Sequence, residues 1–527
     1  MLSWPNVWVA SFSAVPGYLA WVSLVPFIYL WRQSGWRGAF VQGWVLGFIY
    51  YLGILSWITL INRDTNVSNQ FTWLIFSVCG AFYMGLFSAT SKFVSERLRW
   101  PDALVLPLGW VAWEYLRGHV LFGGWPWGSL GHTQYSNVLI RQIAATAGVG
   151  GISFLVAWVN VILAQALARV VASGWGAWPG AWPQAVKPAA WRAKWQQRPV
   201  LGSVTALLVT LWVVLLGVGA VEAVMFVRAP QKHFRVALLQ GNTDTTARWD
   251  RAYKTSLLDR MQRLHLQAVA QKPALIIWAE SCFPGILDYP SEREWEDRLR
   301  GLVKTGGVPT LLTSNEYVQE NNADGQGYHH YNSSFLLGPA GETLGRYRKI
   351  KLVPFGEYIP WEILKKFLHA VVREPIPVDF EPGHEYASLV FGDLNLSPLI
   401  CYEDHFEELG FQLARRGARL FAGMANDRWA GTSAMSYQHT AMSVFLAIEH
   451  RVYMAKANMT GPTCLIDPWG NISRPLPYFQ EGFKLEDVAY TPNYRTFFTR
   501  FGNIVVFSFL ILFFSLLAVA FAVRKRA

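Results

Sequence analysis

Long apolar segments are the feature that most constrains how this chain folds. A helix needs about 20 mostly apolar residues to cross the hydrocarbon core of a bilayer, which is about 30 Å thick. We expect about eight membrane-spanning helices, at roughly residues 4–16, 18–31, 38–61, 71–93, 101–116, 149–172, 201–227 and 501–523. The first segment is short and broken by Pro16, so a cleaved signal peptide is its alternative interpretation. Because no Lys or Arg precedes it and many segments follow, we expect it to be retained.

The composition and the distribution of charge support a membrane protein. Apolar residues make up 52% of the chain and charged residues only 15%, against about 25% in a typical soluble protein. The net charge of +11 would by itself suggest a nucleic-acid partner. Residues 229–495, however, hold 28 basic and 30 acidic residues, whereas the rest of the chain holds 18 and 5. The basic excess therefore accompanies the apolar segments, and we expect no nucleic-acid partner.

The positions of the basic residues predict the orientation in the membrane. Short loops rich in Lys and Arg stay in the cytoplasm. In an eight-span arrangement most of the basic residues outside 229–495 lie on the same side of the membrane. They are Arg32, Arg37, Lys92, Arg97, Arg99, Arg169, Lys187, Arg192, Lys194, Arg198, Arg524, Lys525 and Arg526. We therefore expect both chain ends in the cytoplasm and residues 229–495 on the opposite, extracytoplasmic face.

The region between the last two apolar segments has the pattern of an α/β domain. Short apolar runs that end in polar residues, at 236–241 and 274–281, are typical of buried strands whose C-terminal ends reach a site. Residues 333–338 and 343–349 are expected to pair as a hairpin. Amphipathic helices are expected between the first two strands and near 291–304, 405–416 and 436–450. About 265 residues suffice for one core, and we expect a sheet-on-sheet core flanked by helices.

Cys401 is the candidate nucleophile, because it ends an apolar strand and precedes Tyr402 and Glu403. A buried structural cysteine is common, and a disulfide among Cys282, Cys401 and Cys464 is the alternative on the oxidising side of a membrane. Three cysteines leave at least one thiol free, and Cys401 is the best candidate for it. No Cys or His spacing typical of a metal site occurs, so we expect neither a metal nor another cofactor.

Two further residues could support such a nucleophile. Glu280 ends the strand at 274–281, and a buried carboxylate there would have the raised pKa that a general base requires. Lys349 is followed eight residues later by Glu357, and a cation near a thiolate could stabilise a developing oxyanion. Taken alone, each residue is more often structural: a strand-end Glu frequently caps, and a Lys in a basic cluster is usually solvated.

The motifs around these residues carry a specific resemblance. W-x-E-S at Glu280, Y-x-K-x-x-L-V-P-F-G-E-x-x-P at Lys349 and I-C-Y-E at Cys401 resemble the Glu–Lys–Cys triad of the nitrilase superfamily. With GGWPWGSLGHTQ at 123–134 and NDRW at 426–429, the chain resembles the bacterial apolipoprotein N-acyltransferases over essentially its full length.

The resemblance implies a fold of two parts. These are a polytopic α-helical membrane bundle and an extracytoplasmic αββα nitrilase-like sandwich. The implied domains are the membrane helices at 1–228, the catalytic domain at 229–495, and a last helix with a cytoplasmic tail at 496–527.

The resemblance also implies an activity. Family members move a fatty acyl chain from a phospholipid such as phosphatidylethanolamine to the N-terminal diacylglyceryl-cysteine of an apolipoprotein, the last step of lipoprotein maturation. Cys401 would form a thioester in a ping-pong reaction, Glu280 would be the general base, and Lys349 would stabilise the oxyanion. Supporting roles in orienting or lining the site would fall to Glu357, Tyr402, Glu403 and Trp249. We expect a monomer in the bacterial inner membrane, with the catalytic domain in the periplasm.

Some residues depart from the family pattern or stand outside it. The acidic motif lacks the usual Pro before Glu280, NDRWAG replaces NDAWFG, and Leu446 stands where Arg is common. Cys282, two residues after Glu280, offers Cys401 a disulfide partner. In the membrane part, Glu114 and Arg117 have the spacing of a helical ion pair, and they are either functional or plain anchors. The Trp-rich loop at 123–134 is either re-entrant backbone or an aromatic belt.

Three other functions remain open on these patterns. The domain could be a tethered amidase or nitrilase acting on a small amide, but a tether needs only one span. It could be a degenerate domain on a membrane scaffold, which the intact triad disfavours. The chain could be a transporter, but it has no repeated pair of broken spans.

Overall fold

The computed structural model describes residues 15–61, 69–120, 123–172, 200–243, 250–319, 328–359, 380–431, 434–492 and 494–523. The chain divides into two compact units, which we treat one at a time. The helical unit comprises residues 1–56, 70–221 and 503–527, and the α/β unit comprises residues 57–69 and 222–502. Residues 4–14 of the expected span at 4–16, and the residue Trp249, lie outside the described residues.

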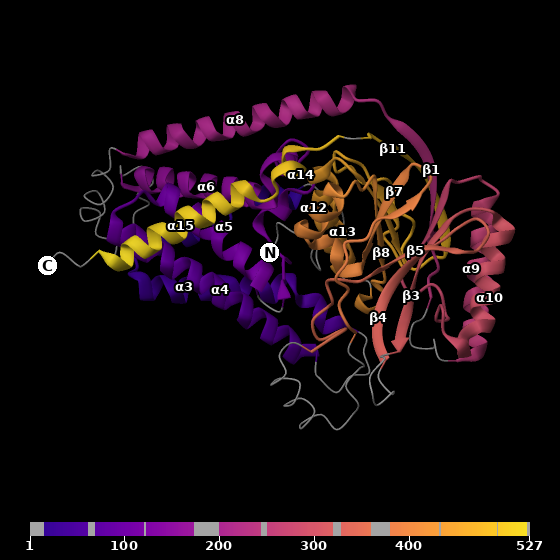
Figure 1. The fold of residues 1–527 in the computed structure, drawn as a ribbon. Coiled ribbons are helices and arrows are strands. Elements are labelled where there is room, and N and C mark those ends of the chain that lie inside the picture. The colour runs from indigo at the N-terminus through magenta and orange to yellow at the C-terminus, as the bar shows by residue number, and fades with distance from the viewer. Residues whose placement is uncertain are drawn as a thin grey trace. The chain divides into compact units, whose positions relative to one another are not determined.

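The described part of the helical unit contains long helices and several short helical segments (Figure 1). Its elements are α1 (Val15–Leu19), α2 (Val25–Trp31), α3 (Trp36–Ile54), α4 (Asn69–Leu98), α5 (Asp102–Val120), η3 (Leu130–Gln134), η4 (Ile140–Ile143), α6 (Ala144–Ala172), α8 (Val200–Arg228) and α15 (Ile504–Ala522). Small residues let the backbones approach closely, as is usual between membrane helices. A Cβ at Gly43 of α3 would collide with Ser88 of α4, and one at Gly47 would collide with Met84.

Four helices in the described part of the chain are long and apolar enough to cross a membrane, rather than the eight expected. They cover Asn69–Leu98, Ile140–Val170, Leu208–Arg228 and Ile504–Ala522. The expected span at 18–31 is two short helices, α1 and α2, separated by turns. The segment at 38–61 stops being α-helical at Ile54 and continues as a 3₁₀ turn, η1 (Ser56–Leu60). Helix α5 carries Asp102, Glu114 and Arg117, which lower its hydropathy.

The α/β unit contains two sheets that differ in strand number. The six-stranded sheet has the order β11-β1-β2-β3-β4-β5, with β1 (Lys232–Gln240), β2 (Leu275–Trp278), β3 (Thr310–Gln319), β4 (Tyr328–Leu337), β5 (Thr343–Arg348) and β11 (Gly482–Tyr490). The five-stranded sheet has the order β10-β9-β8-β7-β6, with β6 (Leu389–Phe391), β7 (Leu394–Ile400), β8 (Leu420–Ala425), β9 (Tyr453–Asn458) and β10 (Cys464–Ile466). In each sheet three central strands run parallel, and the outer strands pair antiparallel.

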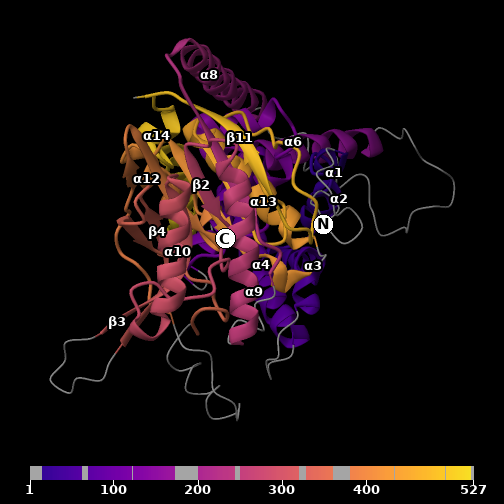
Figure 2. The same cartoon turned by 90° about the vertical axis from the view of Figure 1, so that its right-hand side faces the viewer.

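Helices cover the outer faces of the two sheets, as Figures 1 and 2 show. Helices α9 (Arg251–Val269) and α10 (Arg293–Gly306) lie on one side, and α12 (Glu407–Arg415) and α13 (Met435–His450) lie on the other. One hydrophobic core joins apolar residues of both sheets, among them Ile276 and Leu311 of the first and Leu396 and Leu420 of the second. The prediction of a sheet-on-sheet core flanked by helices is confirmed.

The local predictions for this unit are also confirmed, with small changes at element ends. Strands β4 and β5 pair antiparallel, Ser333 opposite Arg348, as the expected hairpin. The helix expected at 405–416 begins later, at Glu407. The residues before it, Cys401–His405, wind into a short 3₁₀ helix, η6, because the chain turns sharply where β7 ends.

Candidate active site

Three strand ends bring the predicted triad residues together. Glu280 follows β2 by two residues, and Lys349 directly follows β5, both in the six-stranded sheet. Cys401 directly follows β7 in the five-stranded sheet. All three are buried, with exposed fractions of 8%, 1% and 8% respectively. The charges of Glu280 and Lys349 both act on Cys401, so the site forms where the ends of the two sheets meet.

A hydrogen-bond network connects Glu280 to Lys349. Asn332 of β4 donates from Nδ2 to Oε1 of Glu280 at 3.0 Å and to Oε1 of Glu357 at 3.2 Å. Lys349 donates from Nζ to the same oxygen of Glu357 at 2.8 Å, and the backbone N–H of Val353 holds the other oxygen at 2.8 Å. Glu357 thus binds both the Lys349 ammonium group and Asn332. Asn332 was not predicted, because it lies within a strand and belongs to none of the three motifs.

The electrostatics of the site keep the proton on the Cys401 sulfur and raise the pKa of Glu280, the candidate base. Burial raises the pKa of Glu280, although the charge of Lys349 opposes that rise. Burial and then the charge of Glu280 raise the pKa of the Cys401 thiol. Burial alone would lower the pKa of Lys349, but the carboxylates of Glu357 and Glu280 hold it above its usual value. The resting site therefore contains a neutral thiol and an ammonium group.

The turn that carries Cys401 is unusual in its backbone. Cys401 has φ of 52°, in the left-handed region that costs a non-glycine residue about 1–2 kcal/mol. Glu403 stabilises this turn, because its Oε2 accepts a hydrogen bond from the N–H of Ile400 at 2.8 Å. Its Oε1 accepts the N–H of Ile350 at 2.7 Å and the hydroxyl of Tyr347 at 2.7 Å. Glu403 thereby connects the Cys401 turn to the segment that carries Lys349.

The other supporting residues have simpler positions. Burial raises the pKa of Glu403 to about 7, although its hydrogen bonds oppose the rise. Tyr402 is buried and packs edge-to-face on Phe406, with ring centroids 5.0 Å apart. Leu446, which replaces an Arg of the family pattern, is buried in α13 at 2% exposure.

The cysteines do not form a disulfide. Cys79, Cys282, Cys401 and Cys464 are all free thiols. Burial raises the pKa of Cys282 to about 12, and that of Cys464 to about 12, so neither is a reactive thiolate at neutral pH. The disulfide interpretation of Cys401 and Cys282 is therefore wrong for this structure.

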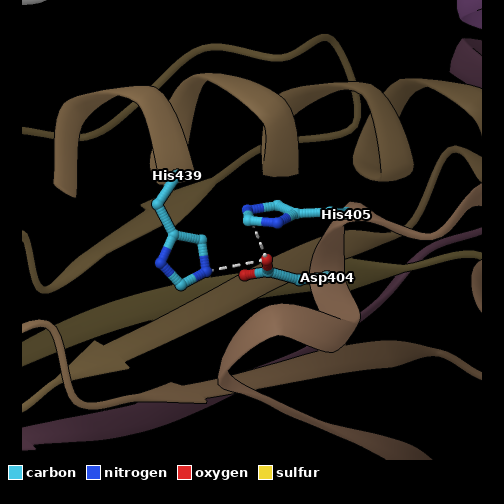
Figure 3. Close-up of side chains that lie close together, drawn as sticks. All are labelled: Asp404, His405 and His439. Atoms are coloured by element: carbon cyan, nitrogen blue, oxygen red, sulfur yellow. Dashed lines mark hydrogen bonds and ion pairs between the residues drawn. The ribbon is translucent and has the colours of Figure 1, made fainter. Parts of the chain in front are cut away.

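A second cluster of titratable residues lies directly behind the Cys401 turn. Asp404, His405 and His439 offer three ligand-type atoms within 4.8 Å of one another (Figure 3). Asp404, however, also accepts the Lys456 ammonium group and the Ser443 hydroxyl. A donor set that already binds an ammonium group does not fit a metal ion, so no metal chemistry is derived from it.

In the helical unit, Glu114 and Arg117 bind the Trp-rich loop instead of each other. Glu114 accepts the backbone N–H of Leu130 at 2.6 Å. Arg117 donates to the carbonyl of Trp125 at 3.0 Å and to that of Trp127. Both tryptophans are buried inside the unit, at 5% and 4% exposure. Both side chains therefore hold the Trp-rich loop, whose two tryptophans are buried within the unit.

A cavity of about 180 Å³ lies beside this loop within the helical unit. Side chains of α3, α4 and α5 line it, among them Tyr50, Phe87 and Trp113, with Gly128 and Leu130 of the loop region. The charged atoms of Glu114 and Arg117 at its wall are already occupied by the loop, so most of the lining that remains is apolar.

Comparison with known proteins gives consistent matches along the chain. A family model for the apolipoprotein N-acyltransferase N-terminal domain matches residues 7–162, and one for carbon–nitrogen hydrolases matches residues 235–491. The chain is 33% identical over 493 residues to the apolipoprotein N-acyltransferase of Geobacter metallireducens, across 92% of this chain and 88% of that protein. It is 28% identical over 527 residues to that of Chlorobaculum tepidum, across 96% and 92%. An amidase from Nesterenkonia sp. matches 52% of this chain and 95% of its own, at 19% identity and a TM-score of 0.37.

The two-sheet fold and the hydrolase model place the α/β unit in the carbon–nitrogen hydrolase class of enzymes. The identity to the Geobacter metallireducens protein over nearly all of both chains narrows this class. The chain belongs to the apolipoprotein N-acyltransferase family, and it is an acyltransferase.

Proposed function

We propose that the protein transfers a fatty acyl chain from a membrane phospholipid to the α-amino group of the N-terminal diacylglyceryl-cysteine of an apolipoprotein. One observation carries the proposal: a neutral thiol, Cys401, shares a buried site with a carboxylate, Glu280, and an ammonium group, Lys349. The names of the curated relatives support the acceptor. The phospholipid donor rests on the family resemblance.

In the first half-reaction Glu280 removes the proton of the Cys401 thiol as the sulfur attacks the ester carbonyl of the phospholipid. The carbonyl oxygen becomes an oxyanion, and the Lys349 ammonium group stabilises it. Collapse of this intermediate breaks the ester C–O bond, and the departing alkoxide takes the proton back from Glu280. The products are a thioester on Cys401 and a lysophospholipid.

In the second half-reaction the α-amine of the acceptor attacks the thioester carbonyl. Glu280 removes a proton from the attacking nitrogen, Lys349 again stabilises the oxyanion, and the C–S bond breaks. The thiolate regains its proton from Glu280, and an amide remains on the acceptor. Because the lysophospholipid leaves before the amine reacts, the kinetics are ping-pong.

The protein's surroundings are part of the proposal. Residues 229–495 form the catalytic domain, and they lie on the periplasmic side of the inner membrane with both chain ends in the cytoplasm. One contact supports this orientation: Arg97, at the end of α4, donates to the carbonyl of Val523, at the end of α15. The basic residues near these two helix ends therefore lie on the same side of the helical unit, as the bias of Lys and Arg toward the cytoplasm requires. The mostly apolar lining of the cavity in the helical unit matches the chemistry of a lipid chain.

Labelling of the purified full-length protein tests the acyl-enzyme. Incubation with phosphatidylethanolamine carrying a labelled acyl chain is expected to label the protein, and neutral hydroxylamine is expected to remove the label, because it cleaves thioesters. Cys401→Ser should remain unlabelled by a hydroxylamine-sensitive bond. Cys464→Ala, which removes another buried thiol of the same unit, should label like wild type. Equal hydroxylamine-sensitive labelling of Cys401→Ser and wild type would contradict the mechanism.

A further inference from the structure

The cluster behind the Cys401 turn consists of buried charged groups, of which Figure 3 shows Asp404 and His439, with His405 beside them. Asp404, Asp427, His439 and Lys456 are each at most 1% exposed. They come from four different places along the chain: η6, the segment after β8, α13 and β9. Asp404 accepts the Lys456 ammonium group, and Ser443 donates to the same oxygen at 2.9 Å.

The hydrogen bonds of His439 define its protonation. Its Nδ1 lies 3.0 Å from Oδ1 of Asp427, and its Nε2 lies 2.9 Å from Oδ1 of Asp404 and 3.2 Å from the backbone oxygen of Cys401. All three partner atoms are acceptors, so both ring nitrogens must donate, and only the imidazolium form carries two N–H groups. The His439 imidazolium and the Lys456 ammonium group then face the two carboxylates of Asp404 and Asp427, and Nε2 of His405 also lies 3.4 Å from Oδ1 of Asp404.

Other features agree with this charge state. Burial alone would lower the pKa of His439, but Asp404 and Asp427 raise it to about 9. The positive charges of His439 and Lys456 hold the pKa of Asp404 well below its usual range in spite of burial. The ring of His405 packs edge-on against His439, with centroids 4.5 Å apart, and completes the enclosure.

The contact to Cys401 connects this cluster to the candidate nucleophile. The carbonyl that His439 binds belongs to the residue whose φ of 52° directs the chain from β7 into η6. Glu403 holds the N–H of Ile400 on the near side of the same turn. His439 holds the carbonyl on its far side, so the turn is restrained at both ends by charged groups.

We propose that His439 is a positioning residue: held between Asp404 and Asp427, its imidazolium binds the Cys401 carbonyl and keeps the left-handed turn that presents the thiol to the substrate. The inference rests on the proposed role of Cys401 as the nucleophile. His439 also counters Asp427, whose charge raises the pKa of both Cys401 and Glu280. Loss of the imidazolium would therefore both free the turn and make the thiol harder to ionise.

Two amide substitutions separate positioning from simple packing. The amide nitrogen of Asn in His439→Asn lies near the place of Nδ1 and keeps the contact to Asp427. The amide nitrogen of Gln in His439→Gln lies near the place of Nε2 and keeps the contact to the Cys401 carbonyl. Both remove the same charge from the same buried position, so they are matched controls for each other.

The measurement is the single-turnover rate of acyl-enzyme formation with labelled phosphatidylethanolamine, together with the rate of Cys401 alkylation by iodoacetamide. We expect His439→Asn to slow both rates on the order of 10- to 100-fold, the effect of one lost charge-assisted hydrogen bond, and His439→Gln to retain the larger part of both. Equal slowing in the two variants, or wild-type rates in His439→Asn, would overturn the proposal. Alkylation does not need a lipid. If the proposed function were wrong, the alkylation difference would persist while wild type formed no acyl-enzyme.

A spectroscopic measurement on the wild-type protein covers the case in which the variants do not fold. With ¹⁵N-labelled histidine at pH 8, one side chain should carry two N–H groups while the histidines of ordinary or lowered pKa are neutral. Its signals should shift when iodoacetamide modifies Cys401. The absence of any doubly protonated histidine at pH 8, or a signal that does not respond to the modification, would overturn the proposal.

Discussion

Two buried polar clusters meet at Cys401, and they differ in how their charges are arranged. On the side of the triad, Glu280, Lys349 and Glu357 leave one carboxylate uncompensated, next to a thiol that keeps its proton. On the other side, Asp404 and Asp427 are matched by His439 and Lys456. An unbalanced cluster has a base with a raised pKa that can accept a proton, whereas a balanced cluster resists any change of charge. The cluster around Glu280 is therefore suited to proton transfer, and the cluster around His439 is suited to holding the backbone in place.

The largest expected effect is that of Glu280→Gln, which removes the base but keeps the acceptor for Asn332. Acyl-enzyme formation should slow on the order of 10²- to 10⁴-fold, because a positioned general base contributes this much. The raised pKa of Glu280 means that the wild-type rate rises with pH as Glu280 loses its proton, above the ordinary carboxylate range. Single-turnover rates across pH check both points. If the rate of Glu280→Gln rose with pH as the wild-type rate does, the general base would be another residue.

The next effect is that of Lys349→Met, which removes the ammonium group at the site. The loss of an oxyanion donor costs on the order of 10²- to 10³-fold in rate. Lys254→Met is the matched control, because Lys254 is also buried and also ion-paired, with Glu292 at 2.8 Å. Quenched time courses of acyl-enzyme labelling should show slow acylation in Lys349→Met but not in Lys254→Met. Comparable rates in the two variants would mean that the Lys349 charge does not act on the reaction.

Asn332→Ala should have a smaller effect. Its bond to Glu280 lowers the pKa of that carboxylate, so its loss should move the rising part of the pH profile to higher pH. At neutral pH the rate should fall on the order of 10- to 100-fold, as expected for lost hydrogen bonds to charged groups. Asn315→Ala removes the residue opposite Asn332 on β3 and should leave the profile in place. An unchanged pH profile in Asn332→Ala would show that Asn332 does not set the pKa of Glu280.

The last effect concerns stability rather than rate, and it belongs to the balanced cluster. The pKa of His439 is raised to about 9 in the folded protein, so its stabilisation is fully present below the unfolded value near 6.5. That stabilisation, on the order of 3 kcal/mol by linkage, is lost as pH rises through about 9. Thermal unfolding midpoints between pH 6 and 10 should fall in wild type. The same fall in His439→Gln would assign the titration to another group.

Glu280 and Cys401 could be predicted from the sequence because each follows an apolar run that forms a buried strand. Lys349 follows the polar strand TLGRYR, so only its motif, which resembles that of the nitrilase superfamily, identified it. The sequence could not identify Asn332, whose partners Glu280 and Glu357 lie 52 and 25 residues away. His439 is separated from Cys401 by 38 residues, and no motif relates the two. Such contacts depend on how α13 packs on η6, which local patterns do not contain.

The membrane part was predicted less well, for a physical reason. The number of apolar residues in a segment does not show where a helix breaks. The segment at 18–31, for example, forms parts of two short helices, α1 and α2. Nor does the number of apolar residues show burial within a unit: in α5, Asp102 and Arg117 are accommodated because each has partners inside the helical unit. Similarly, Glu114 and Arg117 have the spacing of an ion pair, but the loop offers both of them backbone partners.

Mass spectrometry of a lipoprotein N-terminus tests the central claim most directly. A diacylglyceryl-apolipoprotein is incubated in phosphatidylethanolamine vesicles with the wild-type protein or with Cys401→Ala. We expect the wild-type protein to add the mass of one acyl chain in amide linkage to the N-terminal cysteine, and Cys401→Ala to add nothing. An N-terminus that stays diacylated with the wild-type protein, or gains the chain with Cys401→Ala, would contradict this claim.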